Sequence, residues 1–410
     1  MNIDPSNSRG IVIVGAGHAG TEAAFALRSE GLNCPITLIN GEDAFPYQRP
    51  PLSKSFLLSG TSASLRSEQA FANADIELVR ASVEKIERDR RILRLGDGRE
   101  LQYDHLVLAV GAKPHRLTMA ESLWKGNLND LQSTERVRSA LPEAQRIAII
   151  GAGFIGLEFA AVATSLGKEV VVVDRAPRVL ERAASPDISR YIEEQHRSRG
   201  TRIVLDVGLA DLQHYGSTGS ILTLSSGEQI EADLVVEAIG VAPRLDLARQ
   251  ADLSTDIGIV VDHDLLTSDP HISAIGDCAQ FPMRGAARNI VLTSVQNAGD
   301  HAKHAAKRLA GTRAPYSVVP WFWSDQGDDK LQIAGLVPRD ANLVVRRTKN
   351  ERSFSIFSFV DGRLASVETI NAPADHIAAR RILGEGISIS PEQAGNIDFK
   401  LNSLLEKRIV

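Results

Sequence analysis

The sequence Ile11-Val12-Ile13-Val14-Gly15-Ala16-Gly17-His18-Ala19-Gly20 decides the expected fold. Four apolar residues in a row predict a strand that is buried on both faces of a parallel sheet. The three glycines that follow, spaced as GxGxxG, allow a tight turn, a close approach of the backbone to a pyrophosphate and close packing of the next helix. The pattern predicts a nucleotide-binding strand–turn–helix unit.

The same pattern occurs a second time. Residues 147–150 are apolar and run into Gly151-Ala152-Gly153-Phe154-Ile155-Gly156. A helix-like stretch follows each turn, at residues 21–29 and 157–165, and each is followed by another apolar strand. One such match is weak, but two in the same context indicate two separate doubly wound α/β domains. Because two nicotinamides would have nothing to exchange, one of the two dinucleotides is expected to be FAD.

An acidic residue follows the second strand of each repeat. These residues are Glu42, with Asn40 and Asp43 as alternatives, and Asp174. A carboxylate there accepts both ribose hydroxyl groups and repels a 2′-phosphate, so the second site is expected to prefer NADH.

Arg175 and Arg178 argue against a preference for NADH at the second site, because arginines at this place can hold the 2′-phosphate of NADPH. Solvated loop charges are the alternative reading of both. We retain NADH as the expected donor.

The rest of the chain reads as β-rich segments and a third domain. Residues 76–79, 83–86 and 91–95 alternate in the manner of strands and are expected to be β-rich insertions. Glu237 ends an apolar strand, where a solvated acid is the expectation. From residue 316 onward aromatic residues cluster and no glycine fingerprint occurs, which indicates a separate domain.

The composition is that of an ordinary globular chain. It has 410 residues, of which 24% are charged and 43% hydrophobic, and a formal net charge of −5. This mild acidity argues against nucleic-acid binding, which requires a basic face. The N-terminal residues are polar and the longest apolar run is short for a membrane span, so we expect neither a signal peptide nor a membrane partner.

The two cysteines, Cys34 and Cys278, lie far apart and outside any CxxC pair. This predicts neither a disulfide framework nor a zinc site, and no metal centre is expected. Isolated thiols suit a reducing cytoplasm. Because a thiol relay is not supported either, electrons are expected to leave the flavin directly.

Two further segments resemble those of a known family. Tyr47-Gln48-Arg49-Pro50-Pro51-Leu52-Ser53-Lys54 resembles the PYxRPPLSK segment of the putidaredoxin reductase family, which are FAD-containing reductases of two-iron ferredoxins in oxygenase systems. Trp321-Phe322-Trp323-Ser324-Asp325-Gln326, after Pro320, resembles that family's PWFWSDQ segment. The first segment is shared with apoptosis-inducing factor and other reductases, whereas the second points to the ferredoxin reductases. The similarity spans roughly residues 9–385.

The resemblance implies an α/β fold of the glutathione-reductase type, with two doubly wound Rossmann-type domains and a smaller α+β C-terminal domain. The expected FAD-binding domain is discontinuous, at about residues 1–113 and 245–319. The NAD-binding domain is expected at about 114–244 and the C-terminal domain at about 320–410.

The resemblance also implies the cofactor-binding residues. On the FAD side the candidates are Gly15, Gly17, His18, Ala19, Glu42, Arg49, Lys54, Val83, Ala109, Gly111, Gly276, Asp277, Val295 and Trp323. Of these, His18 is as readily explained as a plain turn residue, and Val110 replaces the threonine usual between Ala109 and Gly111. On the NAD side they are Gly151, Gly153, Phe154, Ile155, Glu158, Asp174, Arg182 and Gly240.

Lys54, Glu158 and Trp323 are the expected catalytic residues. A fixed cation such as Lys54 stabilises the negative charge of a reduced flavin. Glu158 lies one turn into the second helix, so an ion pair with Lys54 is expected to hold both groups ionised, two unrelated surface charges being the alternative. Trp323 matches a tryptophan beside the flavin ring. It shares a strand face with Trp321, whereas Phe322 points the other way into core packing.

The function implied is that of an NADH-dependent ferredoxin reductase, a flavoprotein enzyme. Electrons pass from NADH through FAD to a two-iron-two-sulfur ferredoxin, which feeds a monooxygenase or a Rieske-type oxygenase. The alternatives on the same fold are an NADH oxidase and a rubredoxin or quinone reductase. A binding protein like apoptosis-inducing factor is a further alternative, against which the net charge argues. We expect a cytoplasmic protein.

Overall fold

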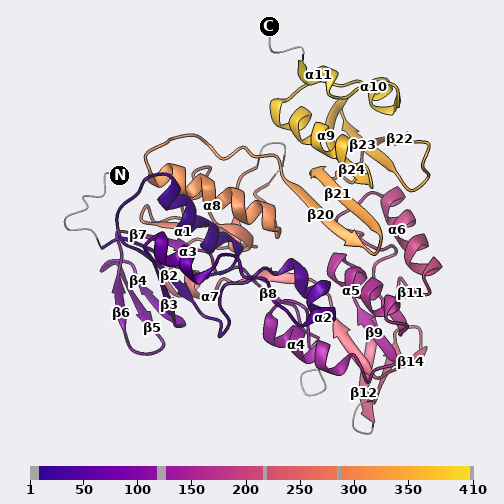
Figure 1. Ribbon diagram of the computed structural model, residues 1–410, viewed down its shortest axis with the longest axis horizontal. Helices are drawn as coiled ribbons and strands as arrows, with labels where there is room; N and C mark the ends of the chain where they lie inside the picture. The colour runs from indigo at the N-terminus through magenta and orange to yellow at the C-terminus, as the bar shows by residue number, and fades with distance from the viewer. Residues whose placement is uncertain (1–8, 118–125, 216–218, 284–285, 287, 407–410) are drawn as a thin grey trace. The chain divides into compact units, whose positions relative to one another are not determined.

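The computed structural model describes residues 9–117, 126–215, 219–283, 286 and 288–406. They belong to two compact units, whose elements Figure 1 labels. The first unit comprises Met1–Arg49, Ser62–Lys113 and Val241–Val318. The second comprises Pro50–Thr61, Pro114–Gly240 and Val319–Val410. The division of the second unit into an NAD-binding and a C-terminal domain stays a proposal.

A parallel sheet forms the centre of the first unit. In the described residues it has five strands in the order β18–β7–β1–β2–β3. The strands are β1 (Ile11–Val14), β2 (Ile36–Asn40), β3 (Ile76–Arg80), β7 (His105–Leu108) and β18 (Ile272–Ala274). The expectation that residues 76–79 belong to an insertion is therefore wrong. This strand pairs with β2 and ends the sheet, because its buried residues Ile76 and Val79 extend the same core.

The position directly after β1, where the first glycine turn begins, requires a glycine. All four residues of β1 are buried, as expected for a central strand. Gly15 then has a φ of +106°, and a Cβ on it would lie 2.3 Å from the Ala109 carbonyl oxygen. Helix α1 (His18–Ser29) starts directly after the turn, three residues earlier than the sequence pattern predicts.

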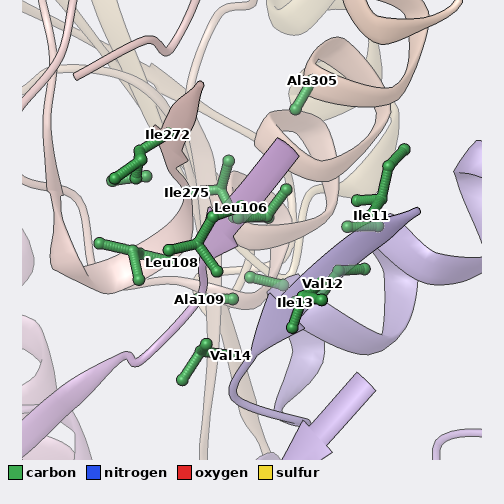
Figure 2. Packing of buried hydrophobic residues seen from close by; sticks show 14 of the residues in the cluster. Ile11, Val12, Ile13, Val14, Leu106, Leu108, Ala109, Ile272, Ile275 and Ala305 are labelled. Atoms are coloured by element: carbon green, nitrogen blue, oxygen red, sulfur yellow. The ribbon is translucent and has the colours of Figure 1, made fainter. Parts of the chain in front are cut away.

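The core of the first unit lies between this sheet and two helices. Helices α1 and α8 (Val295–Leu309) lie side by side (Figure 1). Figure 2 shows Ile11, Val12 and Ile13 of β1 packed with Leu106, Leu108 and Ile272 of the neighbouring strands and Ala305 of α8. Small alanines on both helices allow this close packing.

The remaining elements of the first unit are short. Among the described residues β4 (Val83–Glu87), β5 (Ile92–Leu95) and β6 (Glu100–Gln102) form an antiparallel sheet, which confirms the expected β-rich segment there. The others are α3 (Glu68–Asn73), α7 (Asp246–Gln250), β17 (Ile259–Val260), the 3-10 helix η3 (Gly276–Cys278) and β19 (Ala279–Gln280). The chain leaves this unit through β8 (Ala112–Pro114) and returns through β16 (Val241–Pro243).

The second unit repeats the strand–turn–helix arrangement. Its parallel sheet has the order β11–β10–β9–β15. The elements are β9 (Arg146–Ile150), α5 (Phe154–Ser165), β10 (Glu169–Val173), α6 (Pro186–Ser198), β11 (Arg202–Val204) and β15 (Leu234–Glu237). One face packs against α5, α6 and α4 (Leu131–Ala140), and the other against an antiparallel sheet of β12 (Leu209–Tyr215), β13 (Gly219–Leu224) and β14 (Gln229–Ala232). The predicted pair of doubly wound units is confirmed.

An antiparallel sheet of the order β20–β21–β24–β23–β22 makes up much of the rest of this unit. Its strands are β20 (Trp321–Gln326), β21 (Asp329–Gly335), β22 (Asn342–Arg347), β23 (Phe354–Val360) and β24 (Arg363–Ile370). One face contributes Leu331, Ile356 and Ile370 to the same core as α5 and α6. The other face packs against α9 (Pro373–Glu385), α10 (Pro391–Gly395) and α11 (Ser403–Glu406). The short η1 (Pro50–Ser53) and α2 (Ser55–Ser59) also belong to this unit.

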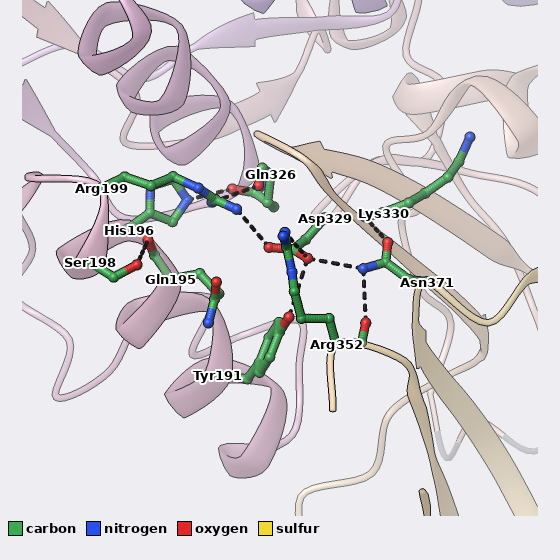
Figure 3. Close-up of polar contacts among 10 residues, drawn as sticks. All are labelled: Tyr191, Gln195, His196, Ser198, Arg199, Gln326, Asp329, Lys330, Arg352 and Asn371. Carbon is green, nitrogen blue, oxygen red and sulfur yellow. Dashed lines mark hydrogen bonds and ion pairs between the residues drawn. The ribbon is translucent and has the colours of Figure 1, made fainter. Parts of the chain in front are cut away.

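A buried carboxylate, Asp329, ties the antiparallel sheet to α6 (Figure 3). It accepts hydrogen bonds from Arg199 at 2.8 Å, Arg352 at 2.8 Å and Asn371 at 2.9 Å. Burial raises the pKa of Asp329, but the hydrogen bonds from these three residues outweigh it and bring the pKa below its usual value. A buried charge is tolerated only when it is paired and hydrogen-bonded in this way.

Asp329→Ala is expected to lower the free energy of unfolding by about 3 kcal/mol, because two guanidinium groups lose their shared carboxylate. The measurement is urea denaturation at pH 7. Glu193→Ala is the control, since it removes an exposed pair with Arg197 on α6 and should cost less than about 1 kcal/mol. The difference between wild type and Asp329→Ala should persist above about pH 4 and fade below it, as the lowered pKa is passed. Equal losses of unfolding free energy in Asp329→Ala and Glu193→Ala would contradict the stabilising role of Asp329.

Candidate functional site

The first glycine turn leaves room for a phosphate group. Gly17 is the N-cap of α1, and a Cβ on it would meet nothing within 4 Å. The first turn of α1 carries no acidic residue, so its amide groups and helix dipole favour an anion here. The Thr21 hydroxyl donates to the Ala16 carbonyl at 3.0 Å and holds the turn. These features fit the pyrophosphate of FAD.

Other predicted FAD residues lie at the same edge of this sheet. Ala109 follows β7 and meets Gly15, while a Cβ on Gly276 would lie 2.8 Å from Cβ of Ala19. The His301 ring accepts a hydrogen bond from the Gly276 amide at 3.2 Å and so holds the turn before Asp277. The structure thus gathers candidates from the carboxyl ends of three neighbouring strands, where ligands of open α/β sheets bind.

Three polar candidates of the first unit influence one another. Burial, with Arg49 acting in the same direction, lowers the pKa of His18 to about 4. Burial raises the pKa of Asp277 to about 7, against the opposing effect of Arg49. These shifts favour a neutral His18 and a carboxyl group at Asp277 that can donate or accept a hydrogen bond, whereas the contact of Asp277 with the ribityl chain stays a prediction.

Glu42 is held by side chains of the first resembling segment. Its carboxylate accepts hydrogen bonds from Arg49 at 2.5 Å and from the Tyr47 hydroxyl at 2.7 Å. Asn40 accepts the Glu42 amide hydrogen bond, and Asp43 pairs with Arg80. Of the three alternatives, Glu42 is the residue whose side chain is bound by the first resembling segment, and its contact with FAD stays a prediction.

The remaining FAD candidates of this unit stand at ends of elements. Val83 is the first residue of β4, Val295 is the first residue of α8, and Gly111 has a φ of +66° after β7. Their contact with a cofactor stays a prediction.

The second glycine turn has the same construction. Gly151 has a φ of +112°, and a Cβ on Gly153 would meet nothing within 4 Å. Phe154 and Ile155 begin α5, and Ile155 is 38% exposed. This open, amide-lined turn fits the pyrophosphate of NADH.

Asp174 sits at the carboxyl end of β10 beside this turn. One of its carboxylate oxygens accepts the Ala152 amide at 2.6 Å and the other accepts the Ala176 amide at 2.8 Å. Each oxygen keeps a lone pair, because a carboxylate offers about four acceptor sites. Asp174 can therefore hold the turn and accept ribose hydroxyl groups together.

The arginines near Asp174 differ in their contacts. Arg178 is engaged elsewhere, with Glu181 at 2.5 Å and Ser189 at 2.5 Å, so it is not poised for a 2′-phosphate. Arg175 and Arg182 are exposed. Gly240 follows β15 with a φ of +95°, and its carbonyl accepts the His115 amide.

The expected pair of Lys54 and Glu158 is present within the second unit. The Lys54 Nζ lies 2.6 Å from Glu158 Oε2, which also accepts the Ser53 hydroxyl at 2.6 Å. The Ser324 hydroxyl donates to Glu158 Oε1 at 2.6 Å. Glu158 is only 5% exposed, so these donors compensate for the loss of water. That this pair acts at the flavin stays a prediction.

The tryptophans of β20 share a face as expected. The rings of Trp321 and Trp323 lie 5.4 Å apart, and the Arg380 guanidinium covers Trp321 at 4.2 Å. Phe322 points the other way and stacks on Phe154 at 4.3 Å. Trp323 thus stands in an aromatic pair, and its place beside the flavin ring stays a prediction.

Sequence reasoning missed part of this cluster and misjudged Glu237. Ser53, Ser324 and Gln326 stand inside the two resembling segments, so their polar side chains were the available signal. Glu237 was expected to be solvated, but it is 6% exposed and accepts the Leu117 amide at 3.1 Å. Burial raises its pKa. The reason is that the antiparallel β12–β13–β14 sheet covers its face of β15.

The cysteines are separate and buried. Cys34 and Cys278 are both free thiols. Burial raises the pKa of Cys278 to about 12, so it is a poor thiolate. Neither cysteine is built for a thiol relay.

Two family comparisons describe this chain. Residues 9–307 match the pyridine nucleotide-disulphide oxidoreductase family, and residues 321–405 match the C-terminal domain of reductases. Rhodocoxin reductase of Rhodococcus erythropolis is 43% identical over 397 residues, which cover 95% of this chain and 93% of that protein. Putidaredoxin reductase of Pseudomonas putida is 35% identical over 406 residues, covering 96% of each.

Solved structures agree with the family matches. The ferredoxin reductase for the CYP199A2 system from Rhodopseudomonas palustris superposes with a TM-score of 0.93 at 44% identity, covering 96% of this chain and 99% of that one. The covalent putidaredoxin reductase–putidaredoxin complex gives a TM-score of 0.92 at 34% identity, with 98% and 99% covered. In the described part of this chain, no helix is both long and apolar enough to cross a membrane. The chain therefore belongs to the pyridine nucleotide-disulphide oxidoreductase family, among the reductases of the putidaredoxin reductase type.

Proposed function

We propose that this protein is an NADH-dependent reductase of a two-iron-two-sulfur ferredoxin that feeds an oxygenase. The observation that carries the proposal is the polar cluster around Glu158, built from both segments that resemble the ferredoxin reductases. The relatives named for rhodocoxin and putidaredoxin support it over nearly the whole chain. The two buried thiols suit a protein of the cytoplasm, which is part of the proposal.

Each part of the chain has a role in this reaction. When bound, FAD supplies the redox chemistry that links a two-electron hydride donor to one-electron acceptors. Asp174 and the Gly153 turn bind the adenosine ribose and pyrophosphate of NADH. Lys54, oriented by Glu158, places a fixed positive charge where negative charge develops, and Trp323 shields the flavin ring. No side chain has to act as a nucleophile, because the protein only has to hold the reactants in a reactive geometry.

The test is NADH oxidation by the purified holoenzyme with and without a two-iron ferredoxin from an oxygenase system. We expect strong stimulation by the ferredoxin, with cytochrome c reduction through it as the readout. Rubredoxin is the comparison acceptor, because a rubredoxin–NAD(+) reductase of Pseudomonas putida is 36% identical to this chain over 369 residues. Stimulation by rubredoxin alone, or rapid turnover with oxygen or quinone alone, would overturn the proposal and keep the flavoprotein assignment.

Asp174→Asn is expected to raise the KM for NADH about tenfold and to reduce the preference of the enzyme for NADH over NADPH. The reason is that charge-assisted hydrogen bonds to a ribose contribute about 1.5–3 kcal/mol, and the repulsion of a 2′-phosphate is lost. Steady-state kinetics with both nucleotides measures this. Glu193→Gln, on the same unit, is the control and should change neither KM. An unchanged NADH/NADPH ratio in Asp174→Asn would remove Asp174 from the site.

Lys54→Ala is expected to slow flavin reduction by NADH about 10–100-fold while changing NADH binding less, because the lysine acts on charge that develops during hydride transfer. Stopped-flow absorbance of the flavin separates the rate from the affinity. Lys168→Ala removes a partly exposed cation of the same unit and is the control. Equal reduction rates in Lys54→Ala and wild type would refute the assigned role.

A further inference from the structure

A chain of hydrogen bonds leads from α6 to Glu158. The His196 ring nitrogen Nε2 lies 2.9 Å from Gln326 Oε1, and Gln326 Nε2 donates to the Ser324 hydroxyl at 2.8 Å. Ser324 then donates to Glu158 at 2.6 Å. Figure 3 shows the His196 ring facing the Gln326 side chain. His196, Ser324 and Gln326 are fully buried.

The direction of every bond in this chain is determined by Glu158. An ionised carboxylate can only accept hydrogen bonds, so the Ser324 hydroxyl group must donate its one proton to Glu158. Ser324 can then only accept from Gln326, which turns the amide NH₂ group toward Ser324 and its oxygen toward His196. His196 must therefore carry its proton on Nε2. Burial lowers the pKa of His196, the direction that favours the neutral ring of this arrangement.

Glu158 is bound from two sides as a result. One oxygen is taken by Lys54 and Ser53, and the other by Ser324. Without the Gln326 amide, the Ser324 hydroxyl could rotate away and leave one carboxylate oxygen without its donor. The buried carboxylate and the lysine bound to it would then sample other orientations, and small misplacements of reacting groups are costly in rate.

We propose that Gln326 and His196 are positioning residues, which fix the Glu158 carboxylate through Ser324 and thereby the place of Lys54. This inference rests on the proposed function. It assigns the antiparallel sheet and α6 a part in hydride transfer. Asp329, a few residues along, stabilises the fold and does not belong to this chain of bonds.

The test compares two buried serines that each donate a hydrogen bond to a carboxylate. Ser324→Ala breaks the proposed chain, whereas Ser355→Ala breaks the bond of Ser355 to Asp375 at 2.7 Å elsewhere in the same sheet. We expect Ser324→Ala and Gln326→Met each to slow flavin reduction by NADH at least about fivefold. Ser324→Thr keeps the hydroxyl group and should retain most of the wild-type rate. Ser355→Ala should leave the rate unchanged. The affinity for NAD⁺, measured by calorimetry without turnover, should change less than the rate.

A second readout does not depend on activity. In ¹⁵N-histidine-labelled holoenzyme at pH 8, the His196 ring should show the Nε2–H tautomer, and Gln326→Met should alter its shifts. Equal reduction rates in Ser324→Ala and Ser355→Ala, or the Nδ1–H tautomer in wild type, would overturn the inference. Failure of the wild type itself to be reduced by NADH would instead overturn the proposed function.

Discussion

The buried carboxylate of Glu158 is the constraint on which much of the second unit depends. A charge that is 5% exposed needs donors, and here they come from segments 104 to 166 residues away in the chain. Ser53 and Lys54 are brought to α5 on one side and Ser324 on the other. This requirement explains why residues 50–61, which interrupt the first unit in sequence, pack with the second.

The two glycine turns have the same local structure, and the proposed function assigns a different dinucleotide to each. Gly15 and Gly151 have φ values of +106° and +112°, and a Cβ on them would lie 2.3 Å and 2.4 Å from a carbonyl oxygen, so no side chain fits at either position. The acids beyond them differ. Glu42 is bound by Arg49 and Tyr47, whereas the Asp174 carboxylate accepts from two backbone amides of the described residues and keeps acceptor capacity for a ribose. The two turns therefore share one backbone conformation, and the acids beyond them differ in their partners.

The antiparallel sheet of the C-terminal segment has two faces with different tasks. One face shares a hydrophobic core with α5 and α6, and Asp329 adds a buried ionic contact to the same junction. This packing against α5 and α6 positions β20 so that Ser324 donates to Glu158 and the Trp323 ring lies beside that of Trp321. Packing that stabilises the unit also places polar groups at short hydrogen-bond distances, which a loosely attached domain could not do.

The sequence by itself determined both glycine turns and the strands and helices around them. These follow from local constraints: a backbone that only glycine allows and continuous apolar strands. The pairing of Lys54 with Glu158 was expected from the family resemblance and the opposite charges, and the tertiary structure brings the two residues together across 104 residues of the chain. The burial of Glu237, the place of β3 in the parallel sheet, and the chain from His196 to Glu158 were decided by the tertiary structure. They depend on which distant segments cover a face or supply a donor, and a single strand or helix carries no record of its neighbours.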